Sequence, residues 1–434
     1  MKKFRKIVCA ALASLVCCVG IAGCANKGES TLLRGAEKGE KQSYQEVTED
    51  LPQISAGAEK FASAFAGAAF SQLVGQNFAV SPVSVYMALS LAAQSAAHQT
   101  REEILSALNV SYEELSSGAG YLYRSLNRDF ISGKVRLSNS VWVNEGTQVR
   151  QECLDTLAEQ FFCSSFSADF AHNNQAANDA VRYFVKEQTN GLIDKDFQLT
   201  SDTYFALINA LYLKDSWNTD GRDLSLTADD RTFTGEDGEI ISKKFLQGDY
   251  KPGRVWEGET FSTFYTSTNA GFSIKFLVPK EGYTLSEVFT EENLAAVSGC
   301  RDYNAFDEEN KIRYETRCIF PEFHASFDRD VAGILRSFGI VKLFDGAACD
   351  LTSLMERESM ERGNAYCYKI QHVTDLTVDR KGIEGAAVTV AADGAESAEM
   401  YETVREEFVV DRPFGFILTD TYGTSLFSGA VYSI

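Results

Sequence analysis

Residues 208–217 read Ile-Asn-Ala-Leu-Tyr-Leu-Lys-Asp-Ser-Trp, and they continue an apolar run that begins at Tyr204. Apolar and aromatic residues in a run of this length predict a β-strand over Tyr204–Leu213. Similar strand-like runs occupy residues 135–143, 272–278, 408–418 and 425–432. Strands of such different lengths need a large sheet in which to pair, so the sequence predicts one.

Helical patterns come before most of these strands. Phe61, Phe65 and Leu73 lie near helical spacing within residues 58–76, and residues 85–97 form a longer apolar helical pattern. Thr100-Arg-Glu-Glu103, placed before two apolar residues, is a capping-box signal that predicts the start of another helix. The sequence therefore predicts a fold of mixed α and β structure.

The composition limits the classes of function. The 434 residues are 44% hydrophobic and 24% charged, which is ordinary for a folded protein, and 61 acidic against 41 basic residues give a net charge of −20. A chain this acidic is repelled by phosphate backbones, so nucleic-acid binding is not expected. The sequence contains none of the common nucleotide, zinc-protease, hydrolase-elbow or calcium-loop motifs and no C-x-x-C pair. We therefore expect neither an enzyme nor a cofactor or metal site.

The first residues predict export. Four basic residues within positions 2–6 precede a short apolar stretch, Ile7–Ala22, as in a secretory signal peptide over residues 1–23. Ile21-Ala-Gly-Cys24 resembles the lipobox of bacterial lipoproteins, which predicts lipidation of Cys24. Residues 24–50 are polar and rich in Lys, Glu and Gly, and are expected to form a flexible tether. The protein is thus expected at the cell surface, with a lipid as its only contact with the membrane.

Six cysteines follow the predicted lipidation site: residues 153, 163, 300, 318, 349 and 367. Export would permit disulfides, and six cysteines allow fifteen pairings among which the sequence does not choose. Buried free thiols are the simpler interpretation.

Nine short motifs resemble, in order, those of the serpin family. Residues 208–217 are similar to V-N-A-x-x-F-K-G-x-W, with departures at Ile208, Leu213 and Asp215. The other eight are Asn77–Ser84 (N-x-x-x-S-P-x-S), Thr100–Ile104 (T-x-x-E-I), Leu137–Val143, Ser167–Phe170, Thr189–Ile193, Phe320–Phe323, Phe338–Phe344 and Asp411–Phe414 (D-R-P-F). On these motifs residues 51–434 are identified as a serpin domain.

The resemblance implies a single α+β domain with three β-sheets, about nine helices and an exposed reactive-centre loop at about 380–407. It replaces the three domains of ~150 residues that length alone suggests. It also implies an irreversible, suicide-substrate inhibitor of serine proteases. The target protease cleaves the loop and becomes covalently attached while the loop inserts into the central sheet, a known case of strand addition. Such a protein is a monomer that needs no cofactor.

The loop has the composition that insertion demands. No proline occurs between Pro321 and Pro413, and alternate residues from Ile383 to Ala391 would face the core while Glu384 points to water. The hinge matches inhibitory serpins at Gly382, Glu384, Ala386, Ala387 and Thr389, and departs at Ile383, Gly385 and the preceding Arg380.

A second set of residues resembles the family's polar cluster beneath the point where the central sheet opens. Its members are Ser81, Ser84, Asn209 and His372, and Trp217 matches the tryptophan where insertion starts. The alternative is that the two serines only cap the helix that follows Ser81.

Two counts place the cleaved bond differently. The family's usual spacing from Gly382 gives Glu396–Ser397, whereas the spacing back from Pro413 gives Glu402–Thr403. The loop is six residues longer than the family pattern by this comparison. The sequence therefore leaves the position of the bond open.

Met400 and Tyr401 lie between these two positions and are the candidates we favour from the sequence. They suit elastase-like and chymotrypsin-like pockets, whereas Glu396 or Glu402 would suit a glutamate-specific protease. Residues 393–407 hold six acids and one base, which would complement a cationic protease or simply keep the loop soluble.

A competing function also stays open. The chain could be a non-inhibitory surface protein of the same fold that binds a partner or ligand. The small residues at 385–387 favour inhibition, and the departures at Arg380 and Ile383 argue against it.

Overall fold

The computed structural model describes residues 28–37, 52–130, 133–217, 223–300, 303–357, 365–367, 370–384 and 401–434. The predicted signal peptide, Cys24 and residues 385–400 of the predicted loop lie outside these ranges. Within them the chain forms nine α-helices, one short 3-10 helix and three large sheets, which confirms the predicted α+β class. No helix of the described part is long and apolar enough to cross a membrane.

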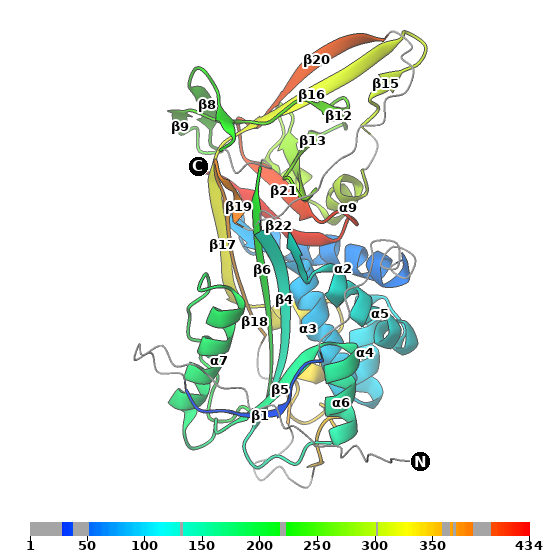
Figure 1. The fold of residues 1–434 in the computed structure, drawn as a ribbon, viewed down its shortest axis with the longest axis vertical. Helices are drawn as coiled ribbons and strands as arrows, with labels where there is room; N and C mark the ends of the chain where they lie inside the picture. Colours follow the sequence, from blue (N-terminus) through cyan, green and yellow to red (C-terminus); the bar gives the residue numbers. More distant parts are fainter. Residues whose placement is uncertain are drawn as a thin grey trace, which may run out of the picture.

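The central sheet runs along the length of the molecule (Figure 1). Its strand order is β1-β5-β4-β6-β19-β18-β17, and β3 pairs with β4. Their bounds are β1 (Thr31–Arg34), β3 (Arg128–Phe130), β4 (Gly133–Asn144), β5 (Cys163–Ala168), β6 (Phe205–Ser216), β17 (Phe323–Asp330), β18 (Gln371–Val378) and β19 (Gly382–Glu384).

Two further sheets lie at one end. One has the order β12-β13-β14-β21-β22-β2: β12 (Trp256–Glu257), β13 (Phe261–Ser267), β14 (Ser273–Pro279), β21 (Phe414–Thr419), β22 (Ser425–Val431) and β2 (Phe78–Val80). The other is built on β16 (Ile312–Phe320) with β11 (Lys251–Pro252), β10 (Leu246–Gln247), β7 (Ser225–Leu226), β15 (Phe306–Asp307) and β20 (Glu402–Val409). β8 (Arg231–Thr234) and β9 (Ile240–Lys243) form a separate hairpin.

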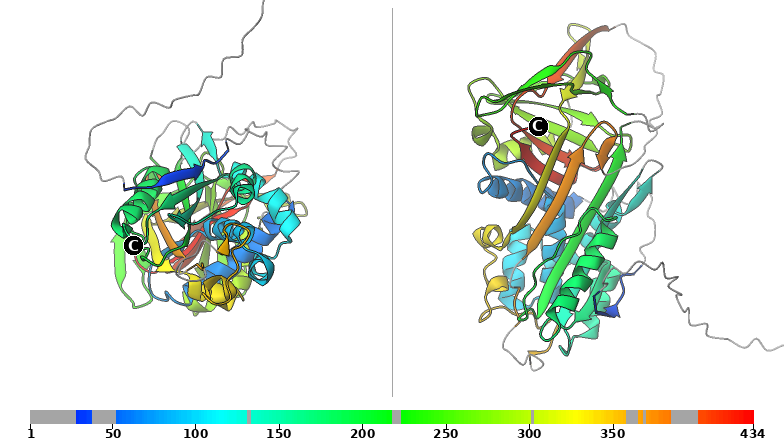
Figure 2. Two further views of the ribbon diagram at one scale, coloured as in Figure 1. Left: turned by 90° about the horizontal axis from the view of Figure 1, so that it is seen from below. Right: turned by 90° about the vertical axis from the view of Figure 1, so that its left-hand side faces the viewer.

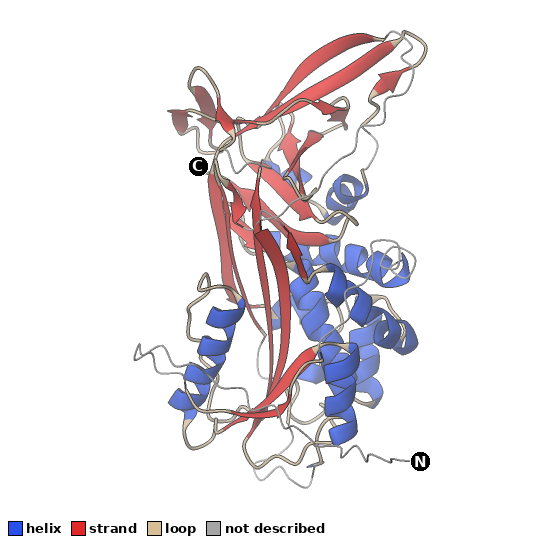
Figure 3. Cartoon of the chain, viewed as in Figure 1, coloured by secondary structure: helices blue, strands red, loops and turns tan. Residues whose placement is uncertain are grey.

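Helices cover both faces of the central sheet (Figure 3). α2 (Pro52–Phe70), α3 (Pro82–Ser95), α4 (His98–Leu108), α5 (Tyr112–Ser125) and α6 (Gln151–Gln160) lie on one side, and α7 (Asn174–Gln188) lies on the other. The rest are α8 (Leu285–Val288), α9 (Glu291–Gly299), α10 (Ala332–Ser337) and the 3-10 helix Lys342–Phe344.

The burial of strand β6 on both of its faces explains why its sequence is continuously apolar. Ala206, Ile208 and Ala210 pack with α7 in one cluster, whereas Leu207 and Leu211 belong to the main core on the opposite face. A strand buried on both faces cannot alternate apolar with polar residues. The same reasoning applies to α3, in which every residue is buried.

Three local predictions were wrong in detail. Helix α2 spans 52–70 rather than 58–76. Thr100 and Glu103 lie inside α4 and do not cap it: the Thr100 hydroxyl accepts from the Asp350 amide, and the Glu103 carboxylate accepts from the amides of Val341 and Lys342. The run 408–418 is two strands, β20 and β21, in different sheets, because Pro413 lies between them and cannot donate to a ladder.

The predicted flexible tether needs a correction as well. Residues 31–34 of that segment form β1, which pairs antiparallel with β5 at the edge of the central sheet. Before it, the Glu29 amide donates to the carbonyl of Ala176 in α7, and after it the Glu37 amide donates to the carbonyl of Ala158 in α6. Residues 28–37 therefore form a strap across the edge strand, a pairing that local composition does not reveal.

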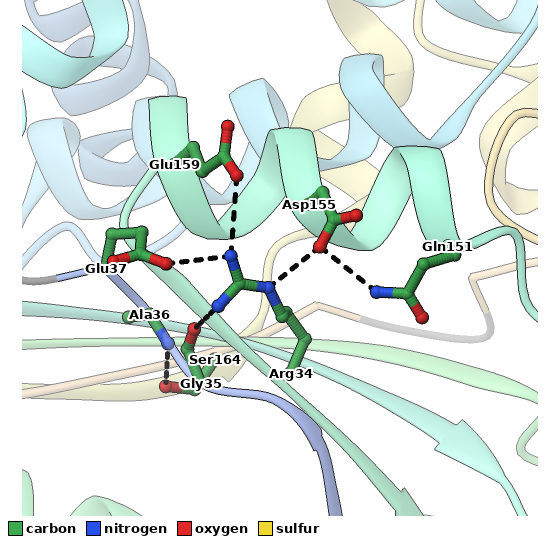
Figure 4. Close-up of polar contacts among 8 residues, drawn as sticks. All are labelled: Arg34, Gly35, Ala36, Glu37, Gln151, Asp155, Glu159 and Ser164. Carbon is green, nitrogen blue, oxygen red and sulfur yellow. Dashed lines mark hydrogen bonds and ion pairs between the residues drawn. The ribbon is translucent and has the colours of Figure 1, made fainter. Parts of the chain in front are cut away.

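Arg34 joins this strap to α6 (Figure 4). Its guanidinium lies 2.8 Å from both Asp155 and Glu37 and 3.5 Å from Glu159. The hydrogen bond from Arg34 lowers the pKa of the Asp155 carboxyl. The cluster is solvent-exposed, so its strength should fall with added salt.

Removal of residues 1–37 should expose the edge of β5, because the β1 ladder is then lost. We expect amide hydrogen exchange in residues 163–168 to rise at least about tenfold, while exchange in β14 stays unchanged. Arg34→Ala, which keeps the ladder, should give a smaller increase. Equal exchange in β5 with and without the strap would contradict this account.

Candidate reactive loop and the opening in the central sheet

The predicted loop begins at a tight hairpin between β18 and β19. The chain leaves β18 at Val378 and turns back through residues 379–381. The Asp379 carboxylate accepts from the amides of Lys381 at 2.7 Å and Gly382 at 3.2 Å. The Asp379 amide donates to the carbonyl of Gly382 at 2.9 Å. An aspartate that bonds to the backbone two residues ahead is a common way to fix such a turn.

Strand β19 lies between β6 and β18 and pairs antiparallel with both. Gly382 faces Ser216 and Ile383 faces Asp215 on one side, and Ile383 faces Val378 on the other. The Ile383 side chain is only 1% exposed, so it points into the core as the alternation predicts. The first hinge residues thus already form a short central strand.

Gly382 is required here by close packing. A Cβ added at this position would lie 1.6 Å from the carbonyl oxygen of Asp215, far inside van der Waals contact. Only glycine lets the two backbones approach this closely.

Gly382→Ala should therefore expel β19 from the sheet. We expect trypsin to cut after the exposed Lys381 at least about tenfold faster than in the wild type, because proteolysis follows the population of the open form. Gly333→Ala is the matched control, since its added Cβ meets nothing within 4 Å. Unchanged cleavage in Gly382→Ala would show that the close approach is not needed.

Polar contacts hold the hairpin from both sides. Glu384 points outward, where Lys214 lies 3.1 Å away and the Tyr212 hydroxyl donates to it at 3.2 Å. Burial, followed by the nearby Glu384 charge, raises the pKa of Tyr212 to about 12. Arg380, which replaces the expected glutamate, lies 3.5 Å from Asp223, and its carbonyl accepts from the Leu224 amide at 2.7 Å.

Trp217 stands at the end of β6, beside this hairpin. Its indole nitrogen donates to the carbonyl of Asp379 at 2.7 Å, and its ring packs edge-on against Phe320. The side chain is 6% exposed, so this hydrogen bond is shielded from water. Trp217 therefore contacts the start of the predicted loop directly.

Beyond β19 the two flanking strands lose their common partner. On β6 only Asp215 and Ser216 pair with β19, and on β18 only Thr377 and Val378 do so. Among the described residues, the facing edges of Phe205–Lys214 and Gln371–Leu376 have no ladder partner on that side. Figure 2 (right) shows β6 and β18 continuing past the end of β19. Facing strand edges of this kind can take up an extended segment.

The predicted polar cluster lies beneath these edges, in two groups. The Ser81 amide donates to Nε2 of His372 at 3.0 Å. Separately, the Ser84 hydroxyl donates to the side-chain oxygen of Asn209. The first group ties β18 to the start of α3, and the second ties β6 to the same helix. The capping alternative is wrong for Ser81, whose side chain makes no cap hydrogen bond.

Sequence reasoning missed two members of the cluster. Asn209 donates to the side-chain oxygen of Asn139 at 2.6 Å, and Asn139 in turn donates to the carbonyl of Phe161. Thr374 donates to the carbonyl of Ala79. Asn139 and Asn209 are register partners in the β4–β6 ladder, a signal that becomes visible only once the pairing of the two strands is known.

His372 is neutral in this setting. Burial lowers the pKa of His372 to about 3, because the charged ring would lose its hydration, and Nε2 accepts rather than donates. The unfolded chain protonates this residue near pH 6.5 and the folded chain only near 3. His372 therefore costs stability progressively as the pH falls from 6.5 toward 3.

His372→Gln should reduce this pH dependence. Between pH 7.5 and 4.5 we expect the wild type to lose about 3 kcal/mol more free energy of unfolding than the variant, measured by urea denaturation. His324→Gln is the control, because His324 is exposed. The same pH dependence in wild type and His372→Gln would argue that His372 titrates normally.

The far end of the loop is also described from Tyr401 onward. Tyr401 contacts Phe306 of β15 and Glu308 of the β15–β16 connection, and Glu402 is the first residue of β20. The other candidates for the cleaved bond, Glu396, Ser397 and Met400, and the hinge residues Gly385, Ala386, Ala387 and Thr389, lie outside the described residues. The structure thus pairs the start of the loop with β6 and β18, holds its far end at the outer end of β16, and leaves the bond itself open.

Residues 56–434 match the family model described as Serpin (serine protease inhibitor). This chain belongs to the serpin family. It is 27% identical to human neuroserpin over 373 residues, which cover 82% of this chain and 86% of neuroserpin. Membership supports a function of the protease-inhibitor type, and serpins are generally inhibitors rather than enzymes.

Two solved serpin structures show the same fold. The thermophilic serpin tengpin in its native state has a TM-score of 0.69 at 20% identity, covering 94% of this chain and all of tengpin. Thyroxine-binding globulin in complex with thyroxine has a TM-score of 0.67 at 20% identity, covering 88% of this chain and 99% of the globulin. A serpin fold therefore serves a ligand-binding protein too, and the fold alone does not choose between the two functions.

Proposed function

We propose that this serpin is an irreversible, suicide-substrate inhibitor of serine proteases that acts by insertion of its cleaved loop. The observation that carries the proposal is the position of β19 between β6 and β18. Ile383 is buried between β6 and β18, and the edges of these two strands continue without a described partner below it. The hinge is therefore seated at the entrance of the position that an inserted strand would take.

The register of β19 indicates how far such a strand could run. Paired residue numbers on β19 and β6 add up to 598, as for Ile383 with Asp215. A strand that continued in this register from Glu384 would reach the start of β6, Phe205, at residue 393. Its core-facing residues would then be Gly385, Ala387, Thr389, Ala391 and Asp393, of which all but the last are small.

The energy available is sufficient for the mechanism. About nine further residues would gain ladder hydrogen bonds at ~1 kcal/mol each, together with burial of small side chains. The sum is on the order of 10 kcal/mol, which is comparable to the ~5–15 kcal/mol that stabilises a whole domain. Insertion could therefore distort an attached protease enough to stop its catalysis.

The covalent step follows ordinary serine-protease chemistry. The protease serine oxygen attacks the carbonyl carbon of the scissile bond, the C–N bond breaks, and the proton passes to the new amino terminus. The loop is then held to the protease as an ester. If the loop inserts before water attacks the ester, the protease stays trapped.

The two departures from the family's hinge pattern do not oppose this proposal. Arg380 has an acidic partner in Asp223, 3.5 Å away, so its charge is accommodated beside the hinge. Ile383 is larger than the usual threonine, yet it is already accommodated at 1% exposure. Both departures therefore fit a hinge that enters the sheet, and they give no support to the non-inhibitory alternative.

The proposal includes the setting in which the inhibitor works. We infer from the lipobox-like Cys24 and the preceding basic and apolar residues that the protein is an exported, lipid-anchored monomer. Its partner would be an extracellular serine protease of elastase-like, chymotrypsin-like or glutamate-specific type. The serpin would shield the cell surface from that enzyme.

Ile383→Arg tests the proposal, because a buried arginine without a partner is strongly disfavoured. Wild type and variant, each as residues 25–434, are mixed with pancreatic elastase, chymotrypsin, trypsin and a glutamate-specific protease. We expect an SDS-stable complex with the wild type, and with the variant normal cleavage but less than about a tenth of the complex. Ile383→Val, which stays apolar, is the matched control.

Two outcomes would count against inhibition. Equal complex formation by wild type and Ile383→Arg would refute the role of the hinge. Cleavage by these proteases without any complex, and without a rise in thermal stability of the cleaved wild type, would favour the ligand-binding alternative.

A further inference from the structure

Strands β15, β16 and β20 form a ribbon that projects beyond the body of the molecule (Figure 1). β16 and β20 run parallel and pair at every position from Ile312 with Glu402 to Ile319 with Val409. β15 turns back on the outer end of β16, where Phe306 faces Arg313. The predicted loop joins this ribbon at its outer tip.

Tyr401 is fixed at this tip by three different contacts. Its ring packs edge-on against Phe306 with centroids 5.3 Å apart, and the Lys311 ammonium lies 5.3 Å from the ring centroid on a cation–π contact. Its hydroxyl donates to the Glu308 carboxylate at 2.7 Å. One side chain thus engages one residue of β15 and two residues of the β15–β16 connection.

The backbone after Tyr401 is also held, by hydrogen bonds to β16 and its preceding residue. The Glu402 amide donates to the carbonyl of Lys311 at 2.9 Å, so pairing begins at the first residue past the tyrosine. Further along, Arg405 lies 3.0 Å from Glu315 across the two strands. The chain therefore passes from the Tyr401 contacts into a continuous ladder with no free residue between them.

A protease needs several residues on each side of the cleaved bond in an extended and unpaired state. Exposed loops are cut readily, whereas a bond inside a ladder is cut only when that part of the structure opens. Met400–Tyr401, Tyr401–Glu402 and Glu402–Thr403 would each require part of the ribbon to separate. Glu396–Ser397 leaves four residues before the Tyr401 contacts.

We propose that Tyr401, held by Phe306, Glu308 and Lys311, is a positioning residue that fixes the C-terminal end of the reactive loop and directs the target protease to a bond N-terminal to Met400. This inference rests on the proposed function of the loop as the segment that the target protease cleaves. With the bond at Glu396–Ser397, the six additional residues of the loop would lie after it. The count from Gly382 then holds.

The test changes the ribbon and leaves the loop sequence intact. In the double variant Phe306→Ala/Glu308→Ala, Tyr401 loses two of its contacts, but every residue that a protease could recognise in the loop is unchanged. Tyr283→Ala, an exposed aromatic residue outside the ribbon, is the matched control. Tyr401→Phe keeps the ring contacts and removes only the hydroxyl, so it should lie between wild type and the double variant.

The readout is the position and rate of each cut. Chymotrypsin and a glutamate-specific protease are added to residues 25–434, and mass spectrometry of the released C-terminal fragments locates each bond. In the wild type we expect the early cuts by the glutamate-specific protease to lie N-terminal to Met400, and chymotrypsin, for which residues 385–399 hold no aromatic residue, to cut after Tyr401 only slowly. In the double variant, cuts after Tyr401 and Glu402 should become about tenfold faster, with the melting temperature unchanged.

The result also separates this inference from the proposed function. Rapid cutting after Tyr401 or Glu402 in the wild type, or identical cut positions in wild type and double variant, would overturn the positioning role even if SDS-stable complexes form. Conversely, a shift of the cuts, with neither an SDS-stable complex nor a rise in thermal stability of the cleaved wild type, would support the positioning role and count against inhibition.

Discussion

The structure depends on the backbone hydrogen-bonding capacity of two strands, β6 and β18, in the middle of one sheet. Interior strands normally satisfy both of their edges, and in the described part of the chain these two share only the short β19 between them. Because Gly382 has no Cβ, β19 can approach β6 closely enough to pair with it, and the buried Ile383 side chain holds β19 in place. Three sets of contacts lie around β19: the hydrogen bond from Trp217 to the hairpin, the ion pair of Arg380, and the polar groups near the start of α3.

The polar cluster fits a sheet that can change its width. His372 on β18 and Asn209 on β6 each bond to the start of α3 and not to each other among the described residues. Neutral His372 accepts one hydrogen bond from a backbone amide, an interaction that stabilises one strand without locking it to its neighbour. Asn209 has a second partner, Asn139 on β4, so its chain of hydrogen bonds lies on the β4 side of the opening and does not cross it.

Much of this was predictable from residues alone, because the relevant signals are local. The apolar run of β6, the proline-free alternation from Ile383 and the motifs around Ser81 and Trp217 each reflect the immediate surroundings of the chain. The docking of residues 28–37 was not predictable, since it depends on a pairing with β5 more than 120 residues away and on Arg34 meeting α6. The split at Pro413 is predictable from the sequence, because proline cannot donate to a ladder. The Tyr401 contacts join residues nearly a hundred positions apart in the sequence, so no local pattern predicts them.

The strap across β5 would have a mechanical consequence if the proposed lipid anchor is present. Only three residues separate Cys24 from Gly28, where the described strap begins. If Cys24 carries the anchor, any tension between membrane and serpin loads the β1–β5 ladder and the Arg34 ion pairs first. β1 would then detach first, and the tether between the membrane and the folded body would lengthen by about ten residues, or roughly 30 Å. Force would reach the strands that flank the loop only after that.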